Sequence, residues 1–278
     1  MNRSLTESVN PESRDIDLKS TPEILKIINR EDMGVPLAVR REIPRIAEAV
    51  ESVVKSLRGR GRLIYYGAGT SGRIGVVDAA ECAPTYGIAK ERIFAVIAGG
   101  YDAMVTAAET AEDDFDSGAR SAAENRVGPE DTVIGLSASG STPFVTGALT
   151  ESRKRGAATV GIVNNETGTV TDAAEIRIVL LTGPEVITGS TRMKAATAQK
   201  LTVNMISTAA MIRLGRVTGN FMTSMRPANE KLRRRAKFIV GSICMIGEDE
   251  AEAVLEKHDF NIRESVAELR NRAAEGAK

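Results

Sequence analysis

The sequence predicts an α/β fold, with a five-stranded parallel sheet flanked by helices. Short apolar runs alternate with helical patterns along the chain, which is typical of strand-helix units whose strands are buried on both faces. The five runs lie at residues 63–66, 93–98, 132–136, 158–163 and 176–181. Two of them end in turns rich in glycine and hydroxyl side chains, at the strand ends where parallel sheets bind ligands. We therefore expect a flavodoxin-like three-layer sandwich with a ligand site at the carboxyl edge of its sheet.

The composition is that of a globular protein without a charge bias. Of 278 residues, 42% are hydrophobic and 27% are charged, and 37 basic residues balance 37 acidic ones. A neutral chain has no general attraction to nucleic acid or to an anionic membrane, so any anion site must be local. No apolar run reaches the length of a bilayer span, and the polar start lacks a signal-peptide core. We expect a cytoplasmic protein.

Cysteine and histidine usage restricts the chemistry further. Cys82 and Cys244 lie far apart and form no CxxC pattern, which fits a reducing cytosol better than a disulfide framework. His258 is the one histidine, which argues against a histidine-rich metal site and against a Ser-His-Asp triad. The sequence therefore indicates chemistry that other side chains perform.

The chain begins with a polar arm and helices. Residues 1–20 are of mixed charge with a turn at Asn10-Pro11, so we expect an arm that packs on a partner subunit. A short helix follows from Thr21, and apolar residues at helical spacing predict one helix over 36–57. We treat residues 1–58 as a segment that precedes the α/β domain.

The α/β domain is expected over residues 59–226. Its helices are predicted at residues 74–82, 102–111, 115–125, 143–155 and 191–214. After Pro227 the composition shifts to short helices at 229–245, 248–257 and 261–275. We expect residues 227–278 to form a small C-terminal helical appendage.

The turn after the first strand, Gly67-Ala68-Gly69-Thr70-Ser71-Gly72, predicts a phosphate-binding loop. Glycines let backbone N–H groups approach an anion at a helix start, and hydroxyls add further donors. The turn also matches GxGxxG, the dinucleotide-binding pattern. That pattern needs an acidic residue closing the second strand, whereas this strand ends Ile97-Ala98-Gly99-Gly100-Tyr101. A tight turn without any ligand is the other alternative.

A second hydroxyl-rich turn, Ser137-Ala138-Ser139-Gly140-Ser141-Thr142, follows the third strand. Serine and threonine at helix starts are often simple caps, so either turn alone is weak support for a ligand site. Two such turns in one sheet indicate a phosphorylated ligand held from two sides. The residues expected to contact it are Gly69, Thr70, Ser71, Ser137, Ser139, Ser141 and Thr142.

These turns, together with residues 185–191 and Lys194, resemble the sugar isomerase family of phosphosugar-binding domains. Longer segments narrow the resemblance. Gly67–Gly87 (GAGTSGRIGVVDAAECAPTYG) and Gly183–Asn204 (GPEVITGSTRMKAATAQKLTVN) are similar to the N-acetylmuramic acid 6-phosphate etherases, and the likeness covers nearly the whole chain. It implies a sugar isomerase-type sheet, a homodimer, a small phosphosugar substrate, and no metal or redox cofactor.

The resemblance implies a carbon-oxygen lyase of cell-wall amino-sugar recycling. These etherases cleave the D-lactyl ether at C3 of N-acetylmuramic acid 6-phosphate, giving N-acetylglucosamine 6-phosphate and D-lactate. In the open-chain aldehyde a base removes the acidified C2 proton while an acid protonates the departing oxygen, and water then adds back. The alternatives are a phosphosugar-binding regulator similar to the glucokinase regulatory protein, and a phosphosugar isomerase.

The family's two catalytic glutamates fall on Glu81 and Glu112. We expect Glu81 to protonate lactate and then to activate water, and Glu112 to act at C2. Glu81 lies among small, apolar residues, which favours a raised pKa. The alternatives are a solvated carboxylate at the helix end and a partner for Arg73. Glu112 belongs to the acidic run 109–114, which is also typical of a solvated face.

Three further positions complete the predicted site. We expect Lys194 to reach the ligand from the long helix and Glu185 to hold a sugar hydroxyl. A surface ammonium at the helix start is the alternative for Lys194. Ser141 stands where many etherases carry arginine, so one cationic contact of the family is absent. The basic run at 231–237 is typical of a solvent-facing helix, and we expect no nucleic-acid or membrane partner.

Overall fold

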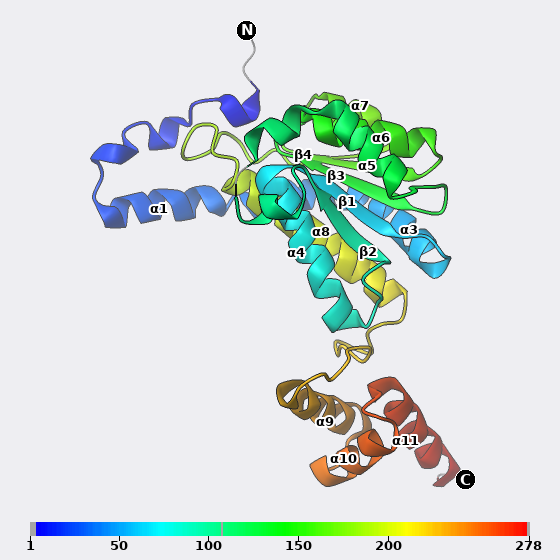
Figure 1. Ribbon diagram of the computed structural model, residues 1–278. Coiled ribbons are helices and arrows are strands. Elements are labelled where there is room, and N and C mark those ends of the chain that lie inside the picture. Colours follow the sequence, from blue (N-terminus) through cyan, green and yellow to red (C-terminus); the bar gives the residue numbers. More distant parts are fainter. Residues whose placement is uncertain (1–3, 107, 277–278) are drawn as a thin grey trace. The chain divides into compact units, whose positions relative to one another are not determined.

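The computed structural model describes residues 4–106 and 108–276 (Figure 1). The ends of the predicted arm and appendage, 1–3 and 277–278, and residue 107 lie outside this description. The expected sheet is present, and its strands are β1 (Leu63–Gly67), β2 (Ile93–Ile97), β3 (Thr132–Ser137), β4 (Ala158–Val163) and β5 (Ile176–Val179). All neighbouring strands are parallel, in the order β2-β1-β3-β4-β5. The fold class predicted from the alternating apolar runs is confirmed.

The strand order reverses at β1, and this reversal brings the two hydroxyl-rich turns to one edge of the sheet. From β1 the chain moves to β2 on one side, whereas β3, β4 and β5 follow on the other side. Gly67, at the end of β1, is in register with Leu136, near the end of β3. The turns that follow these residues therefore leave the sheet side by side. Open α/β sheets bind ligands at such a reversal, outside the carboxyl ends of their strands.

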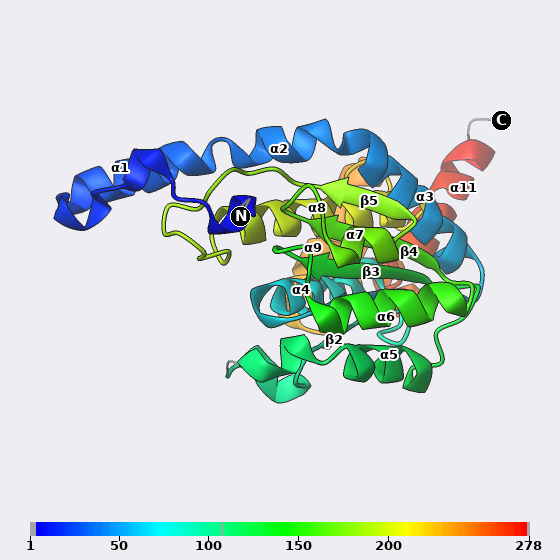
Figure 2. The ribbon, with the colours of Figure 1, turned by 90° about the horizontal axis from the view of Figure 1, so that it is seen from above.

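Two helical layers cover the sheet (Figures 1 and 2). One layer consists of α5 (Phe115–Glu124), α6 (Pro143–Lys154) and α7 (Thr169–Ala173), and the other of α3 (Ile43–Arg58), α4 (Gly69–Tyr86) and α8 (Lys194–Arg213). Strand residues alternate between the layers. A Cβ on Gly135 would meet Val145 and Leu149 of α6, whereas Leu136 lies against Gly75 of α4. Every residue of β1 and β3 is buried, as continuous apolar runs in a parallel sheet predict.

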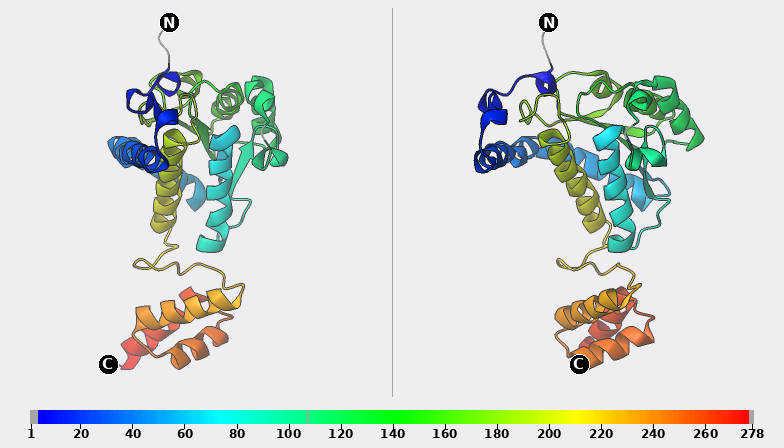
Figure 3. Two further views of the ribbon diagram at one scale, coloured as in Figure 1. Left: turned by 90° about the vertical axis from the view of Figure 1, so that its left-hand side faces the viewer. Right: turned by 60° about the vertical axis from the view of Figure 1, so that its left-hand side comes forward.

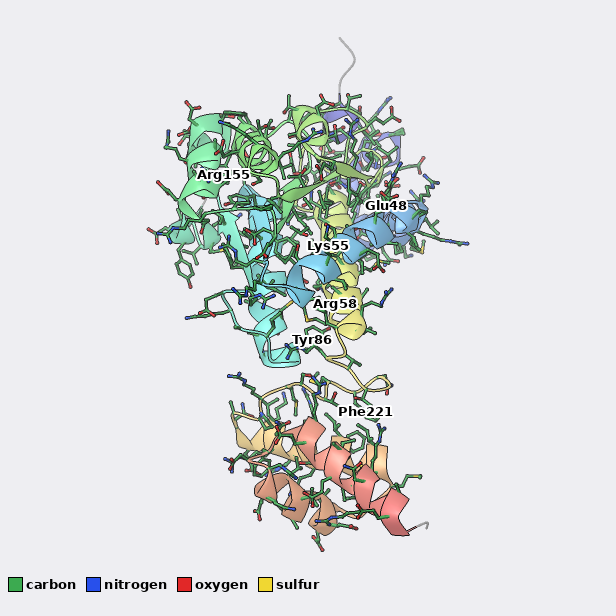
Figure 4. All side chains as sticks on the ribbon, turned by 90° about the vertical axis from the view of Figure 1, so that its right-hand side faces the viewer. Glu48, Lys55, Arg58, Tyr86, Arg155 and Phe221 are labelled. Atoms are coloured by element: carbon green, nitrogen blue, oxygen red, sulfur yellow. The ribbon has the colours of Figure 1, made fainter. Side chains whose placement is uncertain are left out.

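The N-terminal helices differ from the prediction at one point. The helices before β1 are α1 (Thr21–Asp32), α2 (Val35–Arg41) and α3. The single helix predicted over 36–57 is wrong, because the chain breaks at Glu42 and restarts with Pro44 in the first turn of α3. Proline lacks an N–H and clashes with the preceding helical turn, but it is tolerated at a helix start. On α3, Glu48, Lys55 and Arg58 are exposed (Figure 4).

The N-terminal arm packs on its own chain in this structure, and its expected packing on a partner subunit stays a prediction. It contains the short 3-10 helices η1 (Leu5–Glu7), η2 (Pro11–Ser13) and η3 (Ile16–Leu18). The Ser13 hydroxyl donates to the carbonyl of Val186 at 2.7 Å, and Asn10 donates to the carbonyl of Pro184 at 3.2 Å. The arm is therefore tied to the loop that precedes α8.

The helix predicted over 102–111 is wrong. Two 3-10 turns occupy this part of the chain instead, η4 (Tyr101–Met104) and η5 (Glu109–Asp113). Gly99 and Gly100 precede them with φ of 83° and 76°, and a Cβ on Gly99 would lie 2.8 Å from the Cβ of Ala108. The chain thus folds back on a glycine turn behind β2, where tertiary packing outweighs the helix propensity of alanine.

The C-terminal helices lie against one another (Figure 3) and have a core of their own. They are α9 (Glu230–Cys244), α10 (Glu248–Lys257) and α11 (Ile262–Gly276), close to the predicted bounds. Their buried apolar residues include Ile239, Val240, Val254, Leu255, Ile262 and Val266. By compactness the chain divides into residues 1–80 with 91–210, and residues 81–90 with 211–278. The boundaries predicted at 58 and 226 stay a prediction.

In the described part of the chain, no helix combines the length and the apolarity that a bilayer crossing requires.

Candidate functional site

The turn after β1 delivers the start of α4 to the carboxyl edge of the sheet. Gly69 opens the helix with φ of 51°, in the left-handed region that favours glycine. Gly67 and Gly72 approach each other so closely that a Cβ on Gly72 would lie 2.8 Å from the carbonyl oxygen of Gly67. Ser71 is buried, and Thr70 is partly exposed. The first N–H groups of an 18-residue helix thereby lie at this edge, where they attract an anion.

The turn after β3 is organised by its own hydroxyl groups. The Oγ of Ser137 lies 2.7 Å from Thr142 Oγ1 and 3.3 Å from Ser139 Oγ, and it accepts the Gly140 N–H at 3.0 Å. The Ser141 N–H donates to Ser139 Oγ at 3.2 Å. Ser137 is buried at the base of the turn, whereas Ser139 and Ser141 are exposed at its rim. A cluster of rotatable hydroxyls suits the several acceptor oxygens of a phosphate group.

The predicted phosphate contacts therefore gather on two adjacent turns. The register of β1 and β3 places them side by side, as expected from two turns in one sheet. The predicted catalytic pair and the pair Glu185 and Lys194 lie on other elements.

Glu112 lies in η5, beyond the carboxyl end of β2, the strand next to β1. This 3-10 turn packs against α6, and its Ala111 contacts the core cluster of the sheet. The side chain of Glu112 is exposed. Its element thus lies at the same edge of the sheet as the two turns, and the role at C2 stays a prediction.

Glu81 lies on α4, twelve residues beyond Gly69. At about 1.5 Å per residue, this spacing is about 18 Å along the helix. The side chain is exposed in the single chain, as the alternative of a solvated helix-end carboxylate predicts, and its catalytic role stays a prediction. Pairing with Arg73 is not observed, since the Arg73 guanidinium donates to the carbonyl of Met104 at 3.0 Å.

Glu185 and Lys194 are buried and engaged within the chain. The Glu185 carboxylate accepts the backbone N–H groups of Lys194 at 3.0 Å and Ala195 at 2.8 Å, which stabilises the start of α8. The Lys194 ammonium lies 2.7 Å from a carboxylate oxygen of Glu31 in α1. Both side chains thus have partners within the chain, and their contacts to a ligand stay a prediction.

The pKa values of the two carboxylates of this cluster, Glu185 and Glu31, are shifted in opposite directions. Burial raises the pKa of Glu185, although its two N–H donors favour the ionised form. Burial also acts to raise the pKa of Glu31, but hydrogen bonds from Lys194 and Asn10 hold it below its ordinary value. Glu31 is thus ionised at neutral pH, as the buried ammonium beside it requires.

Two family descriptions match parts of the sequence. "Glucokinase regulatory protein N-terminal SIS domain" matches residues 45–153, and "SIS domain" matches residues 115–209. In fold, the chain is similar to the phosphoheptose isomerase of Neisseria gonorrhoeae, with a TM-score of 0.52 over 69% of this chain and 98% of that one. The two chains are 17% identical, so this likeness concerns the fold alone.

Whole-chain relatives decide the family. The chain is 48% identical over 259 residues to the N-acetylmuramic acid 6-phosphate etherase of Caldanaerobacter subterraneus subsp. tengcongensis, over 93% of this chain and 85% of the relative. It is 47% identical over 269 residues to the etherase of Symbiobacterium thermophilum, over 97% and 89%. The chain belongs to the N-acetylmuramic acid 6-phosphate etherase family. The resemblance seen in the two turns is confirmed.

This etherase-family chain also contains a buried carboxylate that sequence reasoning missed. Asp78, on α4, accepts hydrogen bonds from the Tyr65 hydroxyl at 2.8 Å, Asn204 Nδ2 at 2.7 Å and Ser207 Oγ at 3.0 Å. Burial raises its pKa, although the three donors oppose the shift. Asp78 ties α4 to β1 and α8. An acidic residue inside the apolar run 74–80 was the sequence signal.

Among the described residues of this etherase-family chain, no group of three or more histidine, cysteine, aspartate or glutamate side chains is placed to hold a metal ion.

Proposed function

We propose that the chain cleaves the D-lactyl ether at C3 of N-acetylmuramic acid 6-phosphate and releases N-acetylglucosamine 6-phosphate and D-lactate. One observation carries the proposal: two hydroxyl-rich turns lie side by side where the strand order reverses. They do so in a chain 48% identical to a relative named for this activity. The activity belongs to cytoplasmic recycling of cell-wall amino sugars.

The two turns bind the phosphate group of the substrate. The N–H groups at the start of α4 and the Thr70 and Ser71 hydroxyls approach it from one side, and Ser137, Ser139 and Thr142 from the other. Ser141 replaces a cationic contact of many relatives, so neutral donors carry this side of the site. Neutral donors and the N-terminus of a helix stabilise the charge of a bound phosphate, so that no buried ion pair is needed. This site belongs to the predicted segment 59–226.

The reaction is an elimination followed by addition of water. Glu112 removes the C2 proton of the open-chain aldehyde, and Glu81 protonates the ether oxygen as the C3–O bond breaks. D-Lactate leaves, and a double bond forms between C2 and C3. Glu81 then takes a proton from water as the oxygen adds to C3, and C2 is reprotonated. A positioned acid or base of this kind contributes about a hundredfold to ten-thousandfold in rate.

We further propose that the active form is a homodimer in which Glu81 serves the turns of the partner. Glu81 lies twelve residues beyond Gly69 in α4, which is about 18 Å along a regular helix, and this spacing supports the exchange. Leu25 of α1, Met33 between the two helices and Leu37 of α2 are 60%, 63% and 55% exposed, which supports an apolar contact with a second copy. A partner that covers Glu81 and Glu112 also excludes the water that surrounds them in a single chain.

The activity is tested by incubating the purified protein with N-acetylmuramic acid 6-phosphate and measuring D-lactate. We expect one D-lactate per substrate, and Glu81→Gln is expected to lower kcat by about a hundredfold or more. Glu124→Gln, at an exposed glutamate of α5, is the matched control and is expected to be fully active.

The same experiment separates the alternatives. A folded protein that binds phosphosugars without releasing D-lactate would contradict the proposal and favour a regulator similar to the glucokinase regulatory protein. Interconversion of an aldose and a ketose phosphate would favour an isomerase.

A further inference from the structure

We propose that the N-terminal arm contributes to the phosphate site. Thr6 of the arm and Asn165 act together as positioning residues for the turn 137–142. The inference rests on the proposed function in one respect, namely that this turn binds phosphate.

Asn165 holds the turn from behind. It follows β4, the strand next to β3, and is 4% exposed. Its Nδ2 lies 3.1 Å from the carbonyl oxygens of both Ala138 and Ser139, and these two acceptors share the one amide hydrogen that is not directed to Thr6. The backbone N–H of Asn164 donates to the Ala138 carbonyl as well, at 3.2 Å. Two successive peptide groups of the turn are thus fixed by the end of β4.

These contacts decide which way the turn presents its backbone. A trans peptide group directs its N–H opposite to its carbonyl. With the Ala138 carbonyl held toward Asn165, the N–H of Ser139 is directed away from Asn165. A donor that is already oriented does not pay an ordering cost when an anion binds. We therefore expect the Asn165 amide to affect anion affinity without touching the anion.

Thr6 of the arm fixes the orientation of that amide. The Thr6 N–H donates to Asn165 Oδ1 at 3.3 Å, and the Thr6 hydroxyl accepts from Asn165 Nδ2 at 3.0 Å. Thr6 contacts both the oxygen and the nitrogen of the Asn165 amide. If the amide were flipped, its NH2 group would face the Thr6 N–H, and two donors would oppose each other. Thr6 is 2% exposed, which shields these bonds from water and strengthens them.

The arm is held in place at its other end too. The bonds of Ser13 to Val186 and of Asn10 to Pro184 attach it to the loop before α8. The arm therefore spans from that loop to the base of the phosphate turn, and the attachment at Asn10 and Ser13 holds Thr6 near Asn165.

The experiment measures the affinity of the full-length protein for inorganic phosphate by calorimetric titration, beside KM and kcat for D-lactate release. Thr6→Val removes the hydroxyl and keeps the shape of the side chain, whereas Thr6→Ser keeps the hydroxyl. Asn165→Ala removes the amide. Ser8→Ala is the matched arm control, because the Ser8 hydroxyl is exposed and donates to the Ser4 carbonyl.

We expect the phosphate Kd to rise about fivefold in Thr6→Val, the effect of one net hydrogen bond, and about tenfold or more in Asn165→Ala. Thr6→Ser and Ser8→Ala are expected within about twofold of the unaltered protein. KM should rise with Kd while kcat changes much less. A residue that only stabilises the fold would lower the melting temperature and leave the phosphate Kd of the folded fraction unchanged.

An unchanged Kd in folded Thr6→Val would overturn the inference, even if Asn165→Ala fails to fold. So would the absence of phosphate binding by the unaltered protein. Phosphate binding with the expected Kd pattern but without D-lactate release would refute the etherase activity and support the inference.

Discussion

At the scale of single residues, buried charge ties the N-terminal helices to the α/β domain. The Lys194 and Glu31 side chains are 3% and 17% exposed, and 2.7 Å separates their charged atoms. An ammonium this deeply buried is stable only beside an ionised partner. Arg30 and Glu12 form a second pair at 3.0 Å from the same helix, but at 55% and 58% exposure. The two pairs differ in burial, which decides how much each contributes.

We predict that Glu31→Gln lowers the free energy of unfolding by about 3 kcal/mol at pH 7, because it leaves the Lys194 ammonium buried and unpaired. The pKa of Glu31 is lower in the folded state than its ordinary 4.5. Its stabilisation is therefore complete above the unfolded pKa and is lost as pH falls through the folded one. The difference between the two proteins should shrink below about pH 4.5.

Urea unfolding at a series of pH values measures this prediction. Glu12→Gln is the matched control, and the loss of its exposed pair is expected to change stability by less than about 1 kcal/mol. Equal effects of the two substitutions at pH 7 would contradict the role assigned to burial.

At the scale of elements, the contact between β1 and the first turn of α4 sets where the phosphate turn lies. Gly67 and Gly72 meet backbone to backbone, and a Cβ on Gly72 would also lie 2.6 Å from the Ile97 side chain. A side chain at this position must push α4 away from the end of β1. The helix start and its N–H groups would move with it.

We predict that Gly72→Ala lowers the free energy of unfolding by about 2 kcal/mol, as overpacked substitutions do, and weakens phosphate binding. Thermal unfolding and phosphate titration measure the two effects. Gly128→Ala is the control, because a Cβ there would meet no heavy atom closer than 4.0 Å. Equal behaviour of the two variants would show that the close approach does not constrain the site.

The element scale also shows where local pattern fails. Continuous apolar runs predicted all five strands correctly, because a strand that is buried on both faces needs apolar side chains at nearly every position. The alanine-rich stretch 102–111 was misread because alanine favours a helix anywhere. The glycines before it turn the chain back onto the sheet. The break between α2 and α3 was missed although Pro44 marks it.

At the scale of the whole molecule, the proposed exchange of Glu81 between subunits makes a distinctive prediction. Ser137→Ala and Glu81→Gln should each be nearly inactive alone. A mixed dimer carries one site with both residues intact and one with neither. Random mixing should therefore restore up to about a quarter of the normal activity.

Co-refolding the two variants and measuring D-lactate release tests the exchange. If Glu81 served its own chain, no mixed dimer would hold an intact site, and mixing would restore nothing. If light scattering shows that the protein is a monomer under conditions in which it releases D-lactate, the proposed homodimer is contradicted.

The sheet, the two hydroxyl-rich turns and the family could be predicted from residues 1–278 alone, because burial periodicity and turn chemistry are local properties of the chain. The partners of the polar side chains could not, because they come from distant parts of the chain. The sequence predicts Lys194 and Glu185 as ligand contacts, and the structure adds that Lys194 pairs with Glu31 and that Glu185 accepts N–H groups at the start of α8. Glu81 is exposed. Thr6 forms a hydrogen bond with Asn165, although the two residues lie far apart in the sequence. A polar group seeks any partner within a few ångströms, and only the folded chain shows which partner lies there.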